Sequence, residues 1–279
     1  MAKSVQSIVY HSFVSILGLF MLYPVLWTLA SSLKPESEIF VNSASLIPSH
    51  MEWKNYLEGW AGFGTVGFNV FFRNSAIVTF VTVAGTLFSS TLVSYGFARL
   101  KFKYKSALFA CLLATIMLPG QVTLIPQYIL FHKMGWVNTF LPLVVPAFIG
   151  GVPFFIFLMI QFIRGIPKEL DQAAVIDGCG TFGTFRHIVL PLTMPALATV
   201  SIFSFYWTWT DFMGPLIYLN KPDLYTASLG LRMFADPSSV TAWGPMFAMS
   251  MLSLLPVFII FLFCQKYLVQ GIATTGLKG

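Results

Sequence analysis

Six long apolar runs, separated by shorter polar segments, dominate the pattern of hydrophobic and polar positions along this chain. A helix that crosses a membrane needs about 20 apolar residues, and each of these runs reaches that length. The pattern therefore predicts an all-α, polytopic membrane protein in which residues 1–279 form a single transmembrane domain. The six expected spans are Ile8 to Leu29, Ser75 to Phe97, Leu108 to Phe131, Leu141 to Ile163, Ala196 to Leu219 and Trp243 to Leu268.

Composition supports a membrane protein and excludes a soluble domain. Hydrophobic residues make up 57% of the chain and charged residues 9%, and the mean hydropathy is +0.79. A soluble domain of this length would carry far more charge. The first run is too long for a removable signal peptide and lacks a matching cleavage site, so we expect it to be a true span.

The basic side chains predict how the spans are oriented. If both termini are cytoplasmic, ten of the 16 Lys and Arg residues fall on inner segments and six on outer ones. Cytoplasmic loops of membrane proteins carry an excess of Lys and Arg. We therefore expect both termini, and the segment 164–195, on the cytoplasmic side of the inner membrane. The net charge of +6 reflects this topology and gives no support for nucleic-acid binding.

The segment 164–195 is a polar, turn-rich loop between the fourth and fifth expected spans. Pro167 and Glu169 predict the start of a short helix, because proline is tolerated and an acid is stabilised in the first helical turn. Gly178 should break this helix, and a second one should begin near Thr181. The first helix also carries two adjacent alanines, which would let another protein's backbone approach closely.

This loop resembles the E-A-A-x-x-x-G-x9-I-x-L-P loop of binding-protein-dependent ABC importer permeases. The matching residues are Gln172, Ala173, Ala174, Gly178, Ile188 and Pro191. Gln172 stands where the family motif has a glutamate, and a neutral amide cannot form the ion pair that a glutamate makes with an arginine. In that family the loop forms two coupling helices seated in a cleft of a cytoplasmic ATPase subunit. The resemblance implies that these residues, with Glu169 and Asp177, couple the chain to an ATPase.

The resemblance covers essentially the whole chain and extends to the smaller, six-span permease subunit of maltose-type carbohydrate importers. Further matching motifs are Asn74-Ser75, Ser94 to Arg99, Leu118-Pro119, Asn138-Thr139 and Gly271 to Gly279. It implies four kinds of partner: membrane lipid, a second and different permease subunit, two ATPase subunits and an external carbohydrate-binding protein. It also implies that Gly276 and Lys278, in the tail, make a second contact with the ATPase.

The sequence contains no G-x-x-x-x-G-K-[ST] motif, the phosphate-binding loop of P-loop NTPases. We therefore expect this chain to bind no cofactor of its own, with ATP and Mg on the partner ATPase subunits. The four histidines show no paired metal-ligand spacing. No catalytic constellation is visible, so we expect a transport subunit and not an enzyme.

The fifth expected span concentrates aromatic residues around Asp211. Sugars present C–H faces that stack on aromatic rings and hydroxyls that pair with carboxylates. The candidate substrate path is therefore Tyr206, Trp207, Trp209 and Asp211. The other interpretation is that Asp211 accepts backbone hydrogen bonds and holds a helix break near Gly214.

The favoured function is import of an oligosaccharide or related carbohydrate, and three alternatives were compared with it. An ion-coupled secondary transporter using Asp211 would leave the loop unexplained, and six spans without an inverted repeat match such folds poorly. An intramembrane enzyme would need catalytic groups at membrane depth, where only Asp211 is available. An importer of the same architecture for another solute class stays open. The outer loop Asn220 to Ala242 is expected to contact the binding protein, through Tyr225, Arg232 and Phe234.

Overall fold

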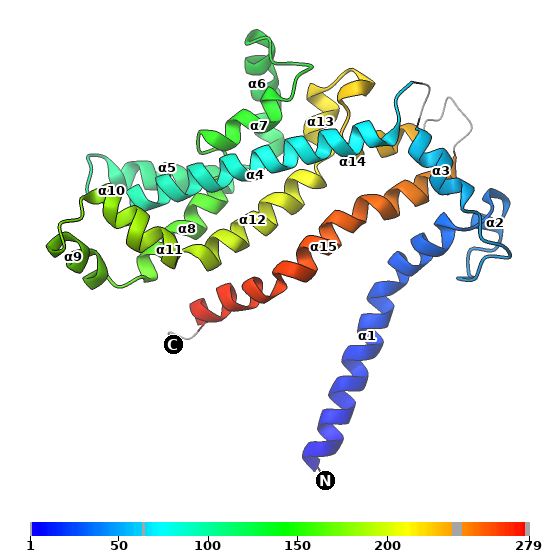
Figure 1. Ribbon diagram of the computed structural model, residues 1–279, viewed down its shortest axis with the longest axis horizontal. Helices are drawn as coiled ribbons and strands as arrows, with labels where there is room; N and C mark the ends of the chain where they lie inside the picture. The colour runs from blue at the N-terminus through cyan, green and yellow to red at the C-terminus, as the bar shows by residue number, and fades with distance from the viewer. Residues whose placement is uncertain (1, 63–64, 236–241, 277–279) are drawn as a thin grey trace. The chain divides into compact units, whose positions relative to one another are not determined.

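The computed structural model describes residues 2–62, 65–235 and 242–276, and every regular element within these residues is a helix. The all-α fold class is thus as expected. Figure 1 labels these helices. The chain forms two compact units. Unit one comprises residues 1–69 and 230–255, and unit two comprises residues 70–229 and 256–279.

Unit one contains the long apolar helix near the start of the chain, the short helices of the first outer segment and the first part of the last helix. Its elements are α1 (Ala2–Ser32), α2 (Glu36–Val41), α3 (Lys54–Ala61), a 3-10 turn (Arg232–Ala235) and the first part of α15 (Trp243–Gly276).

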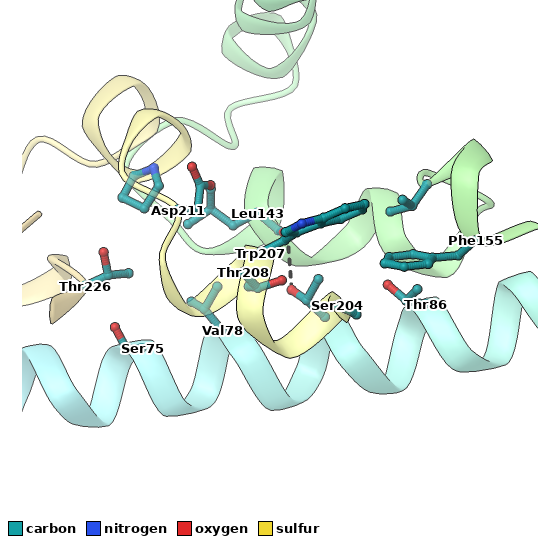
Figure 2. A pocket seen from close by; sticks show the side chains of 13 residues that line it. Ser75, Val78, Thr86, Leu143, Phe155, Ser204, Trp207, Thr208, Asp211 and Thr226 are labelled. Carbon is teal, nitrogen blue, oxygen red and sulfur yellow. Dashed lines mark hydrogen bonds between the residues drawn. The ribbon is translucent and has the colours of Figure 1, made fainter. Parts of the chain in front are cut away.

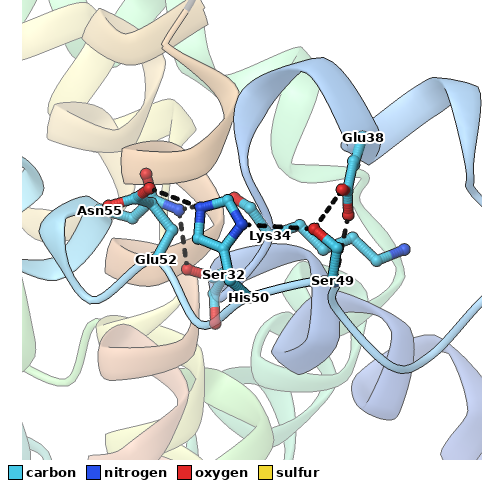
Figure 3. A network of polar contacts seen from close by, with 7 residues as sticks. All are labelled: Ser32, Lys34, Glu38, Ser49, His50, Glu52 and Asn55. Carbon is cyan, nitrogen blue, oxygen red and sulfur yellow. Dashed lines mark hydrogen bonds and ion pairs between the residues drawn. The ribbon is translucent and has the colours of Figure 1, made fainter.

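A buried lysine, Lys34, lies in the chain between α1 and α3, and Figure 3 shows it among neighbouring polar side chains. Lys34 is fully buried, and its Nζ donates hydrogen bonds to the carbonyl oxygens of Asn42, at 2.9 Å, and Ser45, at 2.6 Å. Asn42 caps the carboxyl end of α2, where the helix dipole favours a cation. Asn55 Nδ2 of α3 donates to the carbonyl oxygens of Ser32 and Lys34, at 3.1 and 3.0 Å. Side-chain bonds to the backbone therefore shape this segment.

The same segment contains a carboxylate whose ionised form is stabilised. Glu38 accepts hydrogen bonds from the hydroxyl and the backbone N–H of Ser49 (Figure 3), and these bonds lower the pKa of Glu38 below its usual value. A carboxyl whose pKa is lower in the folded state stabilises the fold above its unfolded pKa. This contribution is lost as the pH falls through the lowered value.

Unit two contains the remaining helices and the second part of α15, and one of its buried clusters lies between α8 and α12. Its buried side chains there are Phe155, Met159, Ala196 and Val200. The elements are α4 (Phe68–Arg99), α5 (Lys105–Met117), α6 (Gly120–Lys133), α7 (Leu141–Phe148), α8 (Pro153–Gly165), α9 (Glu169–Ile176), α10 (Thr181–Thr184), a π-helical turn (Phe185–Val189), α11 (Leu190–Leu192), α12 (Met194–Trp209), α13 (Met213–Tyr218), a 3-10 turn (Pro222–Leu224) and α14 (Ala227–Leu231).

Within the described residues, four helical stretches are long and apolar enough to cross a membrane, or up to six if each of two bent pairs is one span. The four are Gln6–Ser32, Phe68–Arg99, Leu141–Gly165 and Trp243–Gln265. The bent pairs are Lys105–Met117 with Gly120–Lys133, at 104°, and Thr181–Leu192 with Met194–Trp209, at 71°. The six expected spans overlap these stretches and pairs, but the third, fourth and fifth are not continuous helices. They are divided between α5 and α6, between α7 and α8, and between α12 and α13.

Local chemistry explains these interruptions. The fourth expected span breaks after α7, where Gly150 has φ +85° and Pro153 begins α8. The third expected span breaks at Pro119, which precedes α6, because proline disfavours helical backbone in the residue before it. The fifth expected span is helical only to Trp209, and the helix resumes at Met213. The turn between these two helices contains Asp211.

Candidate functional site

The segment 164–195 forms two short helices at one end of unit two, as the sequence predicts (Figure 1). The first, α9, has Glu169 and Asp171 in its first turn. The second, α10, begins at Thr181 and continues through a π-helical turn into α11. Both ends of the segment join helices of unit two, α8 on one side and α12 on the other.

Gly178 ends α9 in the left-handed backbone conformation, with φ +84°. The N–H of Cys179 donates to the carbonyl of Ala174 at 2.8 Å, and the N–H of Gly178 donates to that of Val175 at 3.0 Å. This pair of bonds is the Schellman motif, which closes helix carboxyl ends. No atom lies within 4 Å of a Cβ placed on Gly178, so the backbone conformation alone favours glycine here.

The loop residues expected to meet an ATPase differ in exposure. Six are exposed and one, Ile188, is half-buried; the exposed ones are Glu169, Gln172, Ala173, Asp177, Gly178 and Pro191. Ala174, however, is only 4% exposed. This corrects the expectation that both alanines leave room for a partner's backbone, because Ala174 faces the chain's own interior.

Three apolar side chains of this loop are strongly exposed, and the sequence analysis did not place them among the residues that contact an ATPase. Val175 is 63% exposed, Ile176 is 85% exposed and Phe182, on α10, is 68% exposed. We call these three residues the exposed apolar loop residues. The sequence signal for these exposed residues was the pair of adjacent β-branched residues, Val175 and Ile176, just before the polar turn at Asp177.

The expected tail contact is only partly described. Gly276 is the last residue of α15, and Lys278 lies outside the described residues. Contact of the tail with an ATPase stays a prediction.

A cavity of about 210 Å³ lies between α4, α7, α8 and α12 in unit two (Figure 2). The hydroxyl of Thr82 donates to the carbonyl of Leu143 at 3.3 Å, whereas the hydroxyls of Thr86 and Thr226 are buried without a hydrogen-bond partner. Trp207 stacks on Phe155, with ring centroids 4.9 Å apart. The lining residues are Ser75, Val78, Thr82, Thr86, Leu143, Val152, Phe155, Ser204, Trp207, Thr208, Asp211, Pro215 and Thr226.

Asp211 reaches the cavity from the turn between α12 and α13 (Figure 2). Its Oδ1 accepts a hydrogen bond from the N–H of Gly214 at 3.1 Å, which satisfies a free donor in the first turn of α13. A Cβ on Gly214 would collide with Oδ2 of the same carboxylate. The carboxylate therefore supports the helix break, as one of the two sequence interpretations proposed, and it also lines the cavity.

The structure brings only two of the four candidate path residues, Trp207 and Asp211, to this cavity. Tyr206 is 48% exposed and does not line it. Trp209 is 5% exposed and stacks on Phe205, with centroids 5.5 Å apart. Successive residues of a helix turn by about 100°, so the three aromatic residues of the path cannot share one face.

The hydroxyl groups of α4 are the cavity residues that sequence reasoning missed. The cavity residues of α4 follow one another at intervals of three or four residues: Ser75, Val78, Thr82 and Thr86. This spacing places them on one face of the helix. The signal was present in the sequence as small polar residues at helical spacing in an apolar span.

Two asparagines anchor the described start of the outer segment that follows α13. Asn138 has φ +65°, and its Oδ1 accepts hydrogen bonds from the N–H groups of Asn220 and the next residue, at 3.1 and 3.2 Å. Asn74 Nδ2 donates to the carbonyl oxygens of Asp223 and Tyr225, at 2.8 and 3.0 Å. Both asparagines belong to motifs that carried the family resemblance.

The three residues expected to contact the binding protein from this outer loop differ in their exposure. Arg232 is exposed and Tyr225 is half-buried. Phe234 is 3% exposed and packs against Phe68, with centroids 6.0 Å apart, so the expectation of an interface role for it was wrong. Residues 236–241 of the loop lie outside the described residues.

Comparisons with known proteins agree on one family. Residues 90–274 match the family described as "Binding-protein-dependent transport system inner membrane component". The chain is 38% identical to the "Probable ABC transporter permease protein YurM" of Bacillus subtilis, over 92% of this chain and 84% of that protein. It is 33% identical to the "Arabinooligosaccharides transport system permease protein AraQ" of Bacillus subtilis, over 99% and 97% of the two chains.

A third relative and one solved structure extend this agreement. The chain is 31% identical to the "Maltose/maltodextrin transport system permease protein MalG" of Photorhabdus laumondii, over 92% and 91% of the two chains. Its fold is similar to a chain in the crystal structure of a bacterial ABC transporter involved in the import of the acidic polysaccharide alginate. The TM-score is 0.82 over 96% of this chain and 98% of that chain, at 18% identity. The protein is therefore a multi-pass inner membrane transport subunit and belongs to the binding-protein-dependent transport system inner membrane component family of ABC importer permeases.

Proposed function

We propose that this chain is one of two different permease subunits of an ABC importer that carries an oligosaccharide or related carbohydrate across the inner membrane. An external carbohydrate-binding protein delivers the solute, and two ATPase subunits hydrolyse ATP with Mg. The solute class is supported by two relatives named for arabinooligosaccharide and maltodextrin transport. Both termini and the segment 164–195 lie in the cytoplasm, in agreement with the distribution of Lys and Arg.

The observation that carries the proposal is the pair of short helices with its exposed apolar loop residues. Burying an exposed Ile or Phe side chain stabilises a complex by about 1.5–3 kcal/mol. Ile176, at 85% exposure, and Phe182, at 68%, offer that gain to a partner. The exposed acids Glu169 and Asp177 supply charges at the edge of the same loop. An ATPase cleft that is apolar at its centre and basic at its rim fits this surface.

The cavity beside Asp211 is proposed as part of the solute path. Its unpaired hydroxyls, on Thr86 and Thr226, suit the hydroxyls of a sugar. The stacked rings of Trp207 and Phe155 suit the apolar face of a pyranose. The carboxylate of Asp211 retains acceptor capacity beyond its bond to Gly214.

The two neighbouring tryptophans should respond differently to truncation. Trp209→Ala should lower the yield of assembled importer, because removing a buried aromatic ring costs about 3–5 kcal/mol. Trp207 is 44% exposed and lines the cavity, so Trp207→Ala should leave assembly normal and lower solute uptake severalfold. Assembly yield and uptake are measured on the same preparations. Equal loss of assembly in both variants would assign Trp207 a purely structural role.

Solute-stimulated ATP hydrolysis tests the proposed function as a whole. The chain is purified with its partner permease and ATPase subunits, and the binding protein is loaded with maltodextrin, arabino-oligosaccharide, an amino acid or a peptide. Hydrolysis should rise only with a carbohydrate, and the isolated chain should not bind ATP. Stimulation by the amino acid or peptide alone would overturn the solute class, and ATP binding by the isolated chain would overturn the subunit assignment.

A further inference from the structure

The guanidinium group of Arg99 connects the carboxyl end of α4 to two helices, α8 and α9, between which the 164–195 loop begins. The Arg99 side chain is 5% exposed, and its Nε lies 2.7 Å from Oδ2 of Asp171, in the first turn of α9. Its Nη2 donates a hydrogen bond to the carbonyl of Ile166, the residue that caps α8, at 2.8 Å. A cation is favoured at the carboxyl end of α8 and an anion at the amino end of α9, so both helix dipoles support this arrangement.

A second contact connects α4 to α10, and it is made by Tyr95, one helical turn before Arg99. The hydroxyl of Tyr95 donates to the carbonyl of Thr181, the first residue of α10, at 2.9 Å. The Tyr95 ring lies against that of Phe185, with centroids 4.9 Å apart. Because Tyr95 and Arg99 are four residues apart, they lie on one face of α4. The last turn of α4 thus contacts both short helices of the loop.

The contact between the loop and the end of α4 is largely sealed from solvent. Tyr95 belongs to a buried cluster whose other members are Ile163, Ile166, Phe185 and Val189. The Asp171 side chain is 22% exposed, and its Oδ1 has no hydrogen-bond partner. Arg99 Nη1 is also buried without a partner. The two side chains are therefore held mainly by charge in a place with little water, where removing either one leaves the other uncompensated.

These side-chain contacts link two parts of the chain that the backbone does not join directly. The backbone continues from the loop into α8 and α12, whereas Arg99 and Ile166 are 67 residues apart in sequence and Tyr95 and Thr181 are 86 apart. At 1.5 Å per residue, α4 runs roughly 20 to 36 Å from Arg99 to the residues between Thr86 and Ser75 that line the cavity. A single continuous helix therefore extends from the loop to the cavity.

We propose that Arg99 and Asp171 are positioning residues that make the loop and α4 move together, so that displacement of the loop by the ATPase reaches the solute cavity. The proposal rests on the proposed docking of an ATPase at this loop. It also gives Asp171 a role inside the chain, and leaves Glu169 and Asp177 as the acids that can meet a partner.

The test separates docking from transmission in the intact importer with both permeases, the ATPase subunits and the binding protein. Asp171→Asn, Arg99→Gln and the double variant are compared. Glu58→Gln serves as the control, because it makes the same acid-to-amide change in an exposed ion pair, with Lys54, away from the loop. ATPase recovery, basal ATP hydrolysis and hydrolysis stimulated by the carbohydrate-loaded binding protein are measured. Arabino-oligosaccharide and maltodextrin are the carbohydrates used.

Both single variants should keep ATPase recovery and basal hydrolysis, while stimulation falls about tenfold, within the usual range of coupling between sites. The double variant should lose no more than either single one, because the two residues act as a unit. Glu58→Gln should keep its stimulation, because an exposed ion pair contributes little. If Arg99→Gln fails to assemble, Asp171→Asn decides, because it leaves the bond from Arg99 to Ile166 in place.

Unchanged stimulation in Asp171→Asn would overturn the proposal, and so would additive losses in the double variant. Loss of ATPase subunits from Asp171→Asn would also overturn it, since the pair would then shape the docking surface and not transmit movement. Failure of the docking proposal itself has a different signature, which is normal ATPase recovery when the exposed apolar loop residues are altered.

Discussion

Replacing Ile176 with aspartate should remove the ATPase subunits from the purified importer while the two permease subunits stay paired. Ile176 is 85% exposed at the end of α9, so the change should not disturb the chain's own fold. In the proposed complex this side chain is buried against an ATPase. Losing its burial and placing an unpaired carboxylate there should cost about 4 kcal/mol, or roughly a thousandfold in affinity.

The matched control is Ile47→Asp, which makes the same chemical change at a side chain that is 80% exposed in the first outer segment. Both variants should insert in the membrane and pair with the second permease. ATPase recovery per permease and carbohydrate uptake are measured for each. Normal recovery and uptake with Ile176→Asp would mean that the ATPase docks elsewhere on the chain.

Replacing Gly178 with valine should also abolish coupling, through the backbone and not through a contact. Gly178 has φ +84°, a conformation that costs other residues about 1–2 kcal/mol and a β-branched residue more. The strain should open the Schellman motif and change the direction in which the chain enters α10. ATPase recovery and uptake should both fall, with normal pairing of the permeases.

Gly180→Val is the control for this backbone effect. Gly180 has φ −75° and ψ 176°, which any residue adopts, and no atom lies within 4 Å of a Cβ placed on it. This variant should recover ATPase subunits normally. Equal behaviour of the two variants would show that the left-handed turn at Gly178 is not required for docking.

Family membership removes the rival classes that the sequence left for comparison. An ion-coupled secondary transporter and an intramembrane enzyme are different kinds of protein from an ABC importer permease. The carboxylate of Asp211, on which both rivals relied, bonds to the backbone of Gly214 at the start of α13. Whether an importer of this architecture carries a different solute class is tested by the solute-stimulated ATP hydrolysis described above.

Local signals in the sequence predicted the elements of the loop well. Gly178 ends α9 because the left-handed backbone conformation favours glycine. A single glycine in the sequence is enough to predict such a helix end. The spans were predictable for the same reason, since a membrane-length apolar run is a local property. Pro119 and the turn at Asp211 interrupt two of those runs, and residue counts alone did not reveal the bends of 104° and 71° near these spans.

Features that depend on distant parts of the chain could not be predicted. The pairing of Arg99 with Asp171 arises from packing between segments far apart in sequence. The different surroundings of Trp207 and Trp209 depend on which neighbours cover each face of α12. A sequence pattern places residues on a face, but it does not say what that face meets.

Cross-linking from position 176 tests the central claim most directly. The Ile176→Cys variant is made in a chain whose three native cysteines are replaced by serine, and the assembled importer is treated with a short bifunctional thiol reagent. The account predicts a cross-link to an ATPase subunit that changes in yield when ATP is bound. An importer that transports normally, and whose ATPase cross-links to other positions of this chain but never to position 176, would contradict it.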